Sequence, residues 1–262
     1  MIKAAFFDID GTLVSFNTHE VPASTVRALH QLRSQGILTF IATGRHILTV
    51  NNLGNLKFDG YMTLNGSYCF IDLKVIYKHS IPSADISMLV NYLQEKANFP
   101  CIFVHENALY MNYINEQTTK AFQLLNFPQP PILPLTEAAQ GEIFQLIAFF
   151  TPSQEMEIMP QLPHCQSTRW TSLFSDIIPL GSNKQIGMQK IIEHYGFSRE
   201  EVIAFGDGGN DIPMLQYAGI SVAMGNAKDA VKQSADYVTA SVDEDGIYKA
   251  LTHLDIISAH PF

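Results

Sequence analysis

The sequence predicts an α/β protein built on a parallel β-sheet, and three observations support that prediction. Short runs of consecutive apolar residues are typical of parallel strands that are buried on both faces. Such runs occur at 2–7, 37–42 and 202–205. A helical spacing of apolar residues separates the first two runs, so the chain alternates strand, helix and strand. Each run is also followed by a polar segment that contains glycine, at 8–11, 43–45 and 206–211.

The first part of the chain is predicted to form a βαβ unit followed by a hairpin. After the first strand, a helix begins near Pro22 and ends at Gly36, and the second strand follows directly. Two strand-like runs, at 61–64 and 67–71, flank Asn65-Gly66, a dipeptide that accepts positive φ angles. We therefore expect these two runs to pair through a tight turn.

The pattern changes after Pro82 and returns at Ser182. In between, we predict a helix at 84–97, a proline-rich loop at 127–134, and strands at 101–105, 108–113, 143–150 and 165–178. Beyond Ser182 we predict helices at 184–195, 212–217 and 227–234, and strands at 202–205 and 221–223. The sequence thus predicts a Rossmann-like, doubly wound core formed by 1–81 and 182–262, interrupted by an inserted α+β domain at 82–181.

Composition and charge exclude several functions. The 16 Lys and Arg residues are outnumbered by 25 Asp and Glu residues, a net charge of −9, which argues against binding to nucleic acid or to an anionic membrane. No apolar run approaches the roughly 18 residues that span a bilayer. The three cysteines, Cys69, Cys101 and Cys165, lack the CxxC spacing of zinc sites. We expect buried, reduced thiols in a cytoplasmic protein that is a monomer or a weak homo-oligomer.

Acidic side chains gather where the predicted strands end. Asp8 and Asp10 follow the first strand, and Asp207 and Asp211 follow the strand at 202–205. Ligands of open α/β sheets lie beyond the carboxyl ends of the strands, so these carboxylates are expected to converge. Like charges at close range repel, and a divalent cation relieves that repulsion. Oxygen ligands without His or Cys favour Mg²⁺ over zinc.

Four segments together resemble the motifs of the haloacid dehalogenase superfamily, in the order found there. They are Asp8-Ile9-Asp10-Gly11-Thr12-Leu13, Thr43-Gly44-Arg45, Lys184, and Gly206-Asp207-Gly208-Gly209-Asn210-Asp211. The inserted domain resembles, in size and position, the cap of the Cof-type (subclass IIB) sugar phosphatases. One departure is Gln185, where many of those relatives have glycine after the lysine. The resemblance implies an Mg²⁺-dependent phosphatase that hydrolyses a small phosphorylated metabolite, a sugar phosphate or a phosphorylated cofactor, through an aspartyl-phosphate intermediate.

The resemblance also implies a role for each motif residue. Asp8 is the nucleophile, and Asp10 is the general acid and base. The metal ligands are Asp8, the backbone carbonyl of Asp10, and Asp207, with Asp211 orienting metal-bound water. The phosphoryl oxygens are held by Thr43, Gly44, Lys184 and Asn210.

Other interpretations remain open from the sequence. Arg45 either reaches the substrate or pairs with surface carboxylates, and Asn210 either contacts phosphate or occupies a left-handed turn. Lys184, taken alone, would be a solvated lysine in the first turn of a helix. A phosphomutase would use the same chemistry, and a non-catalytic sensor of phosphorylated metabolites would use the same binding site. Selection among substrates is expected to lie in the inserted domain, with Tyr113 and Trp170 as candidates.

Overall fold

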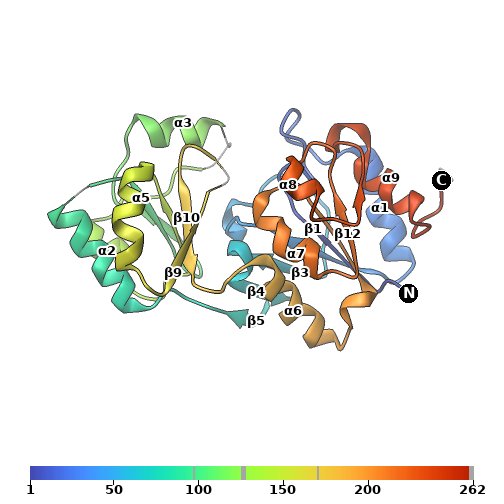
Figure 1. Ribbon diagram of the computed structural model, residues 1–262, viewed down its shortest axis with the longest axis horizontal. Coiled ribbons are helices and arrows are strands. Elements are labelled where there is room, and N and C mark those ends of the chain that lie inside the picture. The colour runs from blue at the N-terminus through green and yellow to red at the C-terminus, as the bar shows by residue number, and fades with distance from the viewer. Residues whose placement is uncertain (97, 125–127, 170, 260–262) are drawn as a thin grey trace. The chain divides into compact units, whose positions relative to one another are not determined.

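The computed structural model describes residues 1–96, 98–124, 128–169 and 171–259 (Figure 1). The chain forms two compact units. The core unit comprises Met1–Arg45, Val50–Tyr77 and Asn183–Phe262, and the inserted unit comprises His46–Thr49 and Lys78–Ser182. The sequence did not indicate that the four residues after Arg45 belong with the insertion. Trp170 and the expected helix end at residue 97 lie outside the described residues.

An eight-stranded sheet forms the centre of the core unit, in the order β13-β12-β11-β1-β2-β3-β4-β5. The pairs from β13 to β3 are parallel, and β3 pairs with β4 antiparallel. The strands are β1 Ala4–Phe7, β2 Leu38–Ala42, β3 Gly60–Thr63, β4 Tyr68–Ile71, β5 Lys74–Lys78, β11 Val202–Gly206, β12 Ile220–Ala223 and β13 Tyr237–Val238. This is the predicted doubly wound core.

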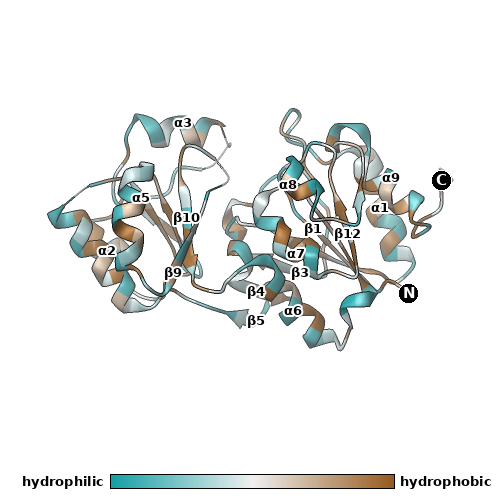
Figure 2. Ribbon diagram, in the orientation of Figure 1, coloured by the Kyte–Doolittle hydropathy of each residue, from teal (hydrophilic) through white to brown (hydrophobic). Residues whose placement is uncertain are grey.

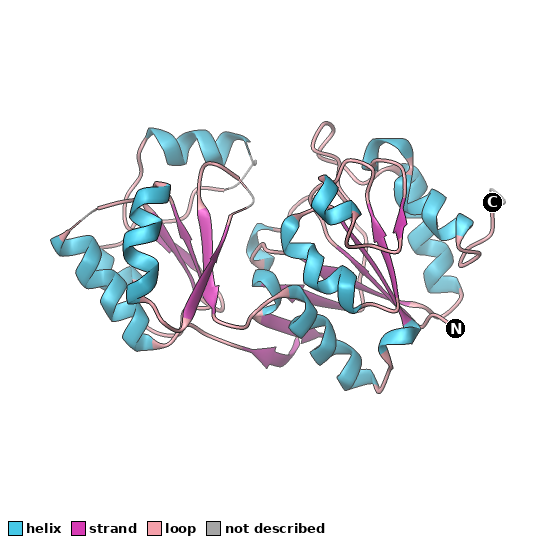
Figure 3. Cartoon of the chain, in the orientation of Figure 1, coloured by secondary structure: helices cyan, strands magenta, loops and turns pink. Residues whose placement is uncertain are grey.

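Helices cover both faces of this sheet, as Figure 3 shows. In β1, Ala5 and Phe7 belong to one buried cluster, whereas Ala4 and Phe6 belong to the other. Successive strand residues point to opposite faces, so every residue of β1 is buried, which explains the unbroken apolar run. The first cluster packs against α1 (Ala23–Ser34) and α9 (Gly246–His253), and the second against α6 (Lys184–Tyr195), α7 (Ile212–Tyr217) and α8 (Asp229–Lys232).

The inserted unit is an α+β structure with a five-stranded antiparallel sheet, in the order β7-β6-β8-β10-β9. Its strands are β6 Cys101–Val104, β7 Leu109–Met111, β8 Gln145–Ala148, β9 Cys165–Thr168 and β10 Ser175–Pro179. Its helices are α2 Ser83–Glu95, α3 Glu116–Leu124, α4 Leu135–Ala138 and α5 Pro152–Ile158. The hydrophobic residues of α2, β6 and β8 form the centre of this unit, and Figure 2 shows the same separation of apolar strands from polar helix faces.

A buried histidine explains why residues 46–49 belong to the inserted unit. His46 is 5% exposed, and its Nε2 lies 3.1 Å from the backbone oxygen of Glu106, in the β6–β7 turn. Its Nδ1 accepts a hydrogen bond from the amide of Leu48. Burial lowers the pKa of His46, so the neutral ring holds this short segment to the insertion.

Most predicted elements are confirmed, with differences at the edges. The helix at 184–195 is confirmed, and the one expected at 227–234 shortens to α8. The predictions missed β5, β13, α3, α4, α5 and α9, and the single strand expected at 165–178 is two strands, β9 and β10. The three cysteines are buried and unbridged, as expected. Across the described residues, no helix is both long enough and apolar enough to cross a membrane.

The hairpin at β3 and β4 is confirmed, but its turn is not the tight two-residue turn we expected. A 3₁₀ turn at Leu64–Gly66 joins the strands, and all three of its residues have positive φ, of 52°, 54° and 89°. The third is Gly66, where a Cβ atom would lie 2.1 Å from the backbone oxygen of Asn183. The turn is therefore shaped by close packing against the start of α6 and not by hairpin geometry alone.

Candidate active site

Three parallel strands and one helix bring the predicted site residues together. Asp8, Thr43 and Asp207 directly follow β1, β2 and β11, whose carboxyl ends meet at one edge of the sheet. Lys184 is the first residue of α6. Carboxylate oxygens of Asp8, Asp207 and Asp211 lie within 4.8 Å of one another.

Lys184 neutralises part of this negative charge. Its side chain is fully buried, and its Nζ donates hydrogen bonds to Oδ1 of Asp8, at 2.7 Å, and to Oδ1 of Asp211. Burial alone would lower the pKa of Lys184, but the carboxylates of Asp211 and Asp8 outweigh it and raise the pKa. The cap of α6 fixes this position, because the side chain of Asn183 accepts from the amide of Ile186. Lys184 is therefore not the solvated lysine of a first helical turn that the residue alone would suggest.

The loop after β11 holds the other two carboxylates rigidly. Oδ2 of Asp211 accepts hydrogen bonds from the amides of Asp207 and Gly208, at 3.0 and 2.8 Å. Oδ1 of Asp207 accepts from the hydroxyl of Thr12 at 2.8 Å. A Cβ atom on Gly11, which has a φ of 91°, would lie 2.3 Å from Oδ2 of Asp207, so only glycine leaves room for that carboxylate.

Asn226 is a site neighbour that the sequence analysis missed. Its Nδ2 donates to the backbone oxygen of Gly11 at 2.8 Å and lies 3.4 Å from Oδ2 of Asp207. Its Oδ1 accepts from the amide of Val242. Asn226 therefore ties the first motif to the C-terminal part of the core unit, and no local pattern around it indicates this role.

When ionised, the three carboxylates carry more negative charge than the described cations neutralise, and their pKa values reflect this. Burial raises the pKa of Asp8 well above its ordinary value; Lys184 opposes that rise, while the neighbouring carboxylates, Asp211 foremost, add to it. Burial and then the charge of Asp211 raise the pKa of Asp207 to about 7. Within the described part of the chain, no ion pair involves Asp207. A closely spaced, oxygen-only donor set with unbalanced negative charge fits a hard divalent cation.

Asp10 lies beside this group and is held by Arg45. The Arg45 Nε and one terminal nitrogen donate to the two carboxylate oxygens of Asp10, at 2.7 and 2.6 Å. This is the bidentate geometry that gives strong, directional pairing. Arg45 therefore pairs with a carboxylate that belongs to the predicted site residues.

Asn65 connects the remaining predicted residues. The backbone amide of Asn65 donates to the backbone oxygen of Thr43 at 3.1 Å, and the side-chain Oδ1 of Asn65 accepts from Nδ2 of Asn210 at 2.9 Å. A Cβ atom on Gly44 would lie 3.1 Å from the same Oδ1. Asn210 is not among the described residues with positive φ, so the left-handed interpretation of Asn210 is wrong. Asn65, which we assigned to hairpin geometry, is instead buried between the second and fourth motifs.

Comparison with known proteins agrees with this geometry. Residues 5–251 match the haloacid dehalogenase-like hydrolase family. YkrA of Bacillus subtilis (strain 168) is 34% identical over 97% of this chain and 98% of its own length. The same organism's 5-amino-6-(5-phospho-D-ribitylamino)uracil phosphatase YcsE is 29% identical over 96% of this chain and 95% of its own. The structure of the HAD subclass IIB sugar phosphatase BT4131 superposes with a TM-score of 0.91 at 46% identity, covering 97% of this chain and 100% of that one.

The fold and its carboxylate site thus define a haloacid dehalogenase-like hydrolase, and the chain belongs to that family. Within the family it is a phosphatase, a hydrolase of phosphoric monoesters, with the α+β insertion of its subclass IIB neighbours. The expected fold class and superfamily are confirmed. The chain is an enzyme, so the non-catalytic sensor is set aside.

We predict that removing the Asn65 side chain slows catalysis because it frees Asn210 and the loop after β2. Misplacing groups that hold a substrate costs roughly 10- to 100-fold in rate. Asn65→Ala also strains a left-handed residue, so Asn65→Gly is the sharper variant, since glycine keeps the backbone conformation. Initial rates with an aryl phosphate and thermal melting of both variants test this.

Asn91→Ala, at an exposed position of α2, is the matched control and should match the wild type. A wild-type rate for Asn65→Gly would show that Asn65 has no positioning role.

Proposed function

We propose that the chain is an Mg²⁺-dependent phosphatase that hydrolyses a small phosphorylated metabolite through an aspartyl-phosphate on Asp8. The observation that carries the proposal is the Asp8 carboxylate itself. It lies at the end of β1, it is hydrogen-bonded to the buried Lys184, and it belongs to the three-carboxylate group. Asp10, a carboxylate able to transfer protons, follows two residues later. Together they provide a nucleophile and an acid–base pair for phosphoryl transfer.

The names of two relatives support the proposed substrate class. BT4131 is a sugar phosphatase, and YcsE is named for a phosphorylated ribitylaminouracil. The substrates given by these two names both have a polar, sugar-derived chain next to the phosphate. We therefore propose a sugar phosphate or a phosphorylated cofactor as the substrate. The inserted domain at 82–181 contains none of the four motifs, so we assign selection of the substrate to it.

The metal site is proposed on the chemistry of its donors. The side chains of Asp8 and Asp207, with the backbone carbonyl of Asp10, would hold the cation, and Asp211 would orient water beside it. When bound, Mg²⁺ supplies positive charge that offsets both the carboxylates and the phosphoryl group. The absence of nitrogen and sulfur ligands from the described group favours Mg²⁺ over Zn²⁺.

In the first step, a carboxylate oxygen of Asp8 attacks phosphorus while the bond from phosphorus to the ester oxygen breaks. Asp10 donates a proton to that departing oxygen, which leaves as an alcohol. Thr43, the amide of Gly44, Lys184 and Asn210 hold the phosphoryl oxygens. Fixed donors aimed at developing negative charge stabilise the transition state more than mobile water can.

In the second step, Asp10, now ionised, accepts a proton from water, and the water oxygen attacks phosphorus. The acyl-phosphate bond breaks, free phosphate leaves, and the Asp8 carboxylate is regenerated. The bidentate contact with Arg45 restrains the Asp10 carboxylate on one side, so that one carboxyl group serves both half-reactions. A phosphomutase would instead transfer the phosphoryl group to a second hydroxyl, and free phosphate as the product from a sugar phosphate distinguishes the two.

We predict that hydrolysis of p-nitrophenyl phosphate requires both Asp8 and Mg²⁺. Asp8→Asn keeps the shape of the side chain but removes the nucleophile, so kcat should fall by at least about 10³-fold. Chelation with EDTA should abolish turnover, and Mg²⁺ should restore it where Zn²⁺ does not. Asp229→Asn, at an exposed position of α8, is the control. Near wild-type turnover by Asp8→Asn, or full activity after chelation, contradicts the mechanism.

We predict that Lys184→Ala lowers kcat/KM by roughly 10²–10³-fold, because a preorganised charge next to the reacting group is lost. Lys190→Ala is the matched control, since Lys190 lies on the same helix, has a side chain that is 39% exposed and pairs at the surface with Glu193. Thermal melting shows whether the Lys184 variant is folded. Equal kcat/KM values for the two variants would remove Lys184 from the site chemistry.

We predict that Asp10→Asn accumulates the phosphoenzyme on substrates whose leaving group needs no protonation. Asparagine can neither donate a carboxyl proton nor accept one from water, so the second step should slow by about 10²–10⁴-fold. With an aryl phosphate of low leaving-group pKa, the first step suffers less. Rapid quench followed by intact-mass analysis measures the intermediate, and equal rates for variant and wild type on alkyl and aryl phosphates would refute this role.

A further inference from the structure

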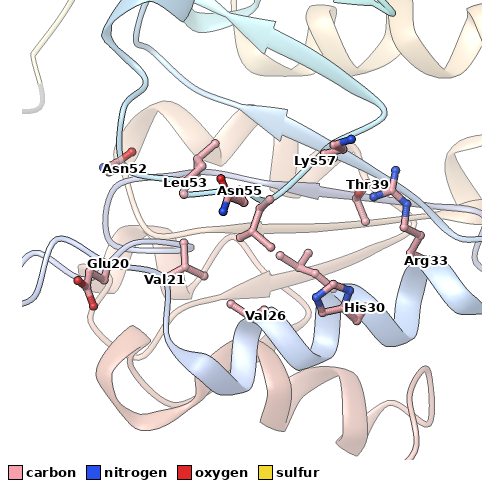
Figure 4. Close-up of a pocket in the computed structure, with 13 residues that line it drawn as sticks. Glu20, Val21, Val26, His30, Arg33, Thr39, Asn52, Leu53, Asn55 and Lys57 are labelled. Atoms are coloured by element: carbon pink, nitrogen blue, oxygen red, sulfur yellow. The ribbon is translucent and has the colours of Figure 1, made fainter.

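We propose that the core unit carries a second ligand site, which binds a small organic anion with an apolar body and a hydrogen-bond donor at its far end. The site is a cavity of about 630 Å³ between α1 and the segment 52–57 (Figure 4). Cavities of roughly 300–1,000 Å³ are typical of small-molecule sites. The proposal is independent of the phosphatase mechanism, since it uses none of its residues.

The cavity lies away from the catalytic edge of the sheet. Thr39, at the beginning of β2, lines it, whereas Thr43 follows the end of that strand. Thr43 lies four positions after Thr39 (43 − 39), which is roughly 13 Å along a strand. A ligand in this cavity therefore does not occupy the carboxylate site.

The floor of the cavity is apolar. Leu29 and Leu53 line it and belong to the buried cluster under α1, and Val21 and Leu56 pack against that cluster while half-buried. Covering such a floor removes apolar surface from water, which favours binding of an apolar body.

The two ends of the cavity differ in charge. In Figure 4, Arg33 and Lys57 lie toward one end, and Glu20 and Asn52 toward the other. Arg33 is half exposed, and its one ion pair among the described residues is a long contact of 3.9 Å to Asp59. Lys57 makes no ion pair within the described part of the chain. The two cations favour an anionic head group at their end, whereas Glu20 repels an anion from the other, so the ligand has one orientation.

The position of Arg33 alone has a simpler explanation, since a basic residue in the last turn of a helix stabilises that helix. Lys57 is not on a helix, and this account does not apply to it. The presence of both cations on the rim of one apolar cavity, in a chain of net charge −9, is what points to an anion.

A buried acceptor in the cavity wall defines the other end of the ligand. Oδ1 of Asn52 is buried and has no hydrogen-bond partner among the described residues. Buried polar atoms are nearly always hydrogen-bonded, because an unmade bond costs the full desolvation of the atom. A hydroxyl or amino group at the far end of the ligand would satisfy this oxygen after a small rotation of the Asn52 side chain toward the cavity.

The length of the cavity sets the length of the ligand. The stretch of α1 from Val26 to Arg33 runs along it, and its seven helical steps (33 − 26) span roughly 10 Å at the rise of an α-helix. That distance suits a chain of about eight carbons. We therefore choose 8-hydroxyoctanoate as the probe, with octanoate and octylammonium as comparisons.

The experiment is an amide-resolved NMR titration of the full chain with each of the three compounds. We expect 8-hydroxyoctanoate to bind with a dissociation constant of about 1 mM or lower, and to shift amides within 20–39 and 52–57. Octanoate should bind more weakly and octylammonium weakest of the three. Saturation at other residues, equal binding of octylammonium and octanoate, or no saturable binding of 8-hydroxyoctanoate would each overturn the proposal.

Variants test the two ends separately. The double variant Arg33→Gln, Lys57→Gln should weaken octanoate binding roughly tenfold, as expected for two exposed ion pairs. Lys74→Gln, at an exposed position of β5, is the matched control and should bind as the wild type does. Asn52→Leu should remove the preference for 8-hydroxyoctanoate over octanoate. All variants should retain the phosphate-release rate, which confirms folding, and unchanged affinities in the double variant would refute the anion site.

Discussion

The active-site edge depends on one buried ammonium group. Lys184 hydrogen-bonds to Asp8, 176 residues away in the chain, and to Asp211, 27 residues away. Buried charges are stable only when they are paired and hydrogen-bonded, and removing one partner leaves the others uncompensated. Asp8, Asp207 and Asp211 would otherwise be three mutually repelling carboxylates at the end of a hydrophobic sheet. The ammonium therefore helps the Asp8 carboxylate, the proposed nucleophile, to exist in a buried position.

The turn that packs against the start of α6, next to Lys184, has a strained backbone. The turn at Leu64–Gly66 has three consecutive positive φ values, although two of its residues are not glycine. Residues in sparsely populated conformations persist only where surrounding contacts impose them. Here Gly66 packs against the start of α6, while Asn65 hydrogen-bonds to the loops that carry Thr43 and Asn210. One strained turn thus relates three separate site segments to one another.

Local patterns explain which parts of this arrangement could be predicted. Strand β1 is buried on both faces, so its end, and hence Asp8, was visible as the point where an apolar run stops. Gly196 also made the end of α6 visible, whereas its Asn183 cap was seen only in the structure. In contrast, β5 is a short edge strand, exposed or half-buried along its length and with a lysine at each end, and it was missed.

Residues whose importance comes from distant partners could not be predicted in this way. Asn65 lies in a local sequence that is equally typical of a hairpin turn, and its contact with Asn210 spans 145 positions. Asn226 contacts Gly11 across 215 positions, and nothing in its neighbourhood marks it. The sequence left two partners open for Arg45, the substrate or surface carboxylates. Only the fold shows that Arg45 pairs with Asp10.

The pairing of the site cations places a limit on how phosphate can bind. Lys184 is engaged with Asp8 and Asp211, and Arg45 is engaged with Asp10. A phosphate monoester adds up to two further negative charges to this edge of the sheet, so the described side chains cannot neutralise it without releasing a carboxylate. Like charges in a poorly solvated site repel strongly, and the chain as a whole is also acidic. Positive charge beyond Lys184 and Arg45 would therefore favour substrate binding at this edge of the core unit, and the carboxylates there are the same groups that can bind a divalent cation.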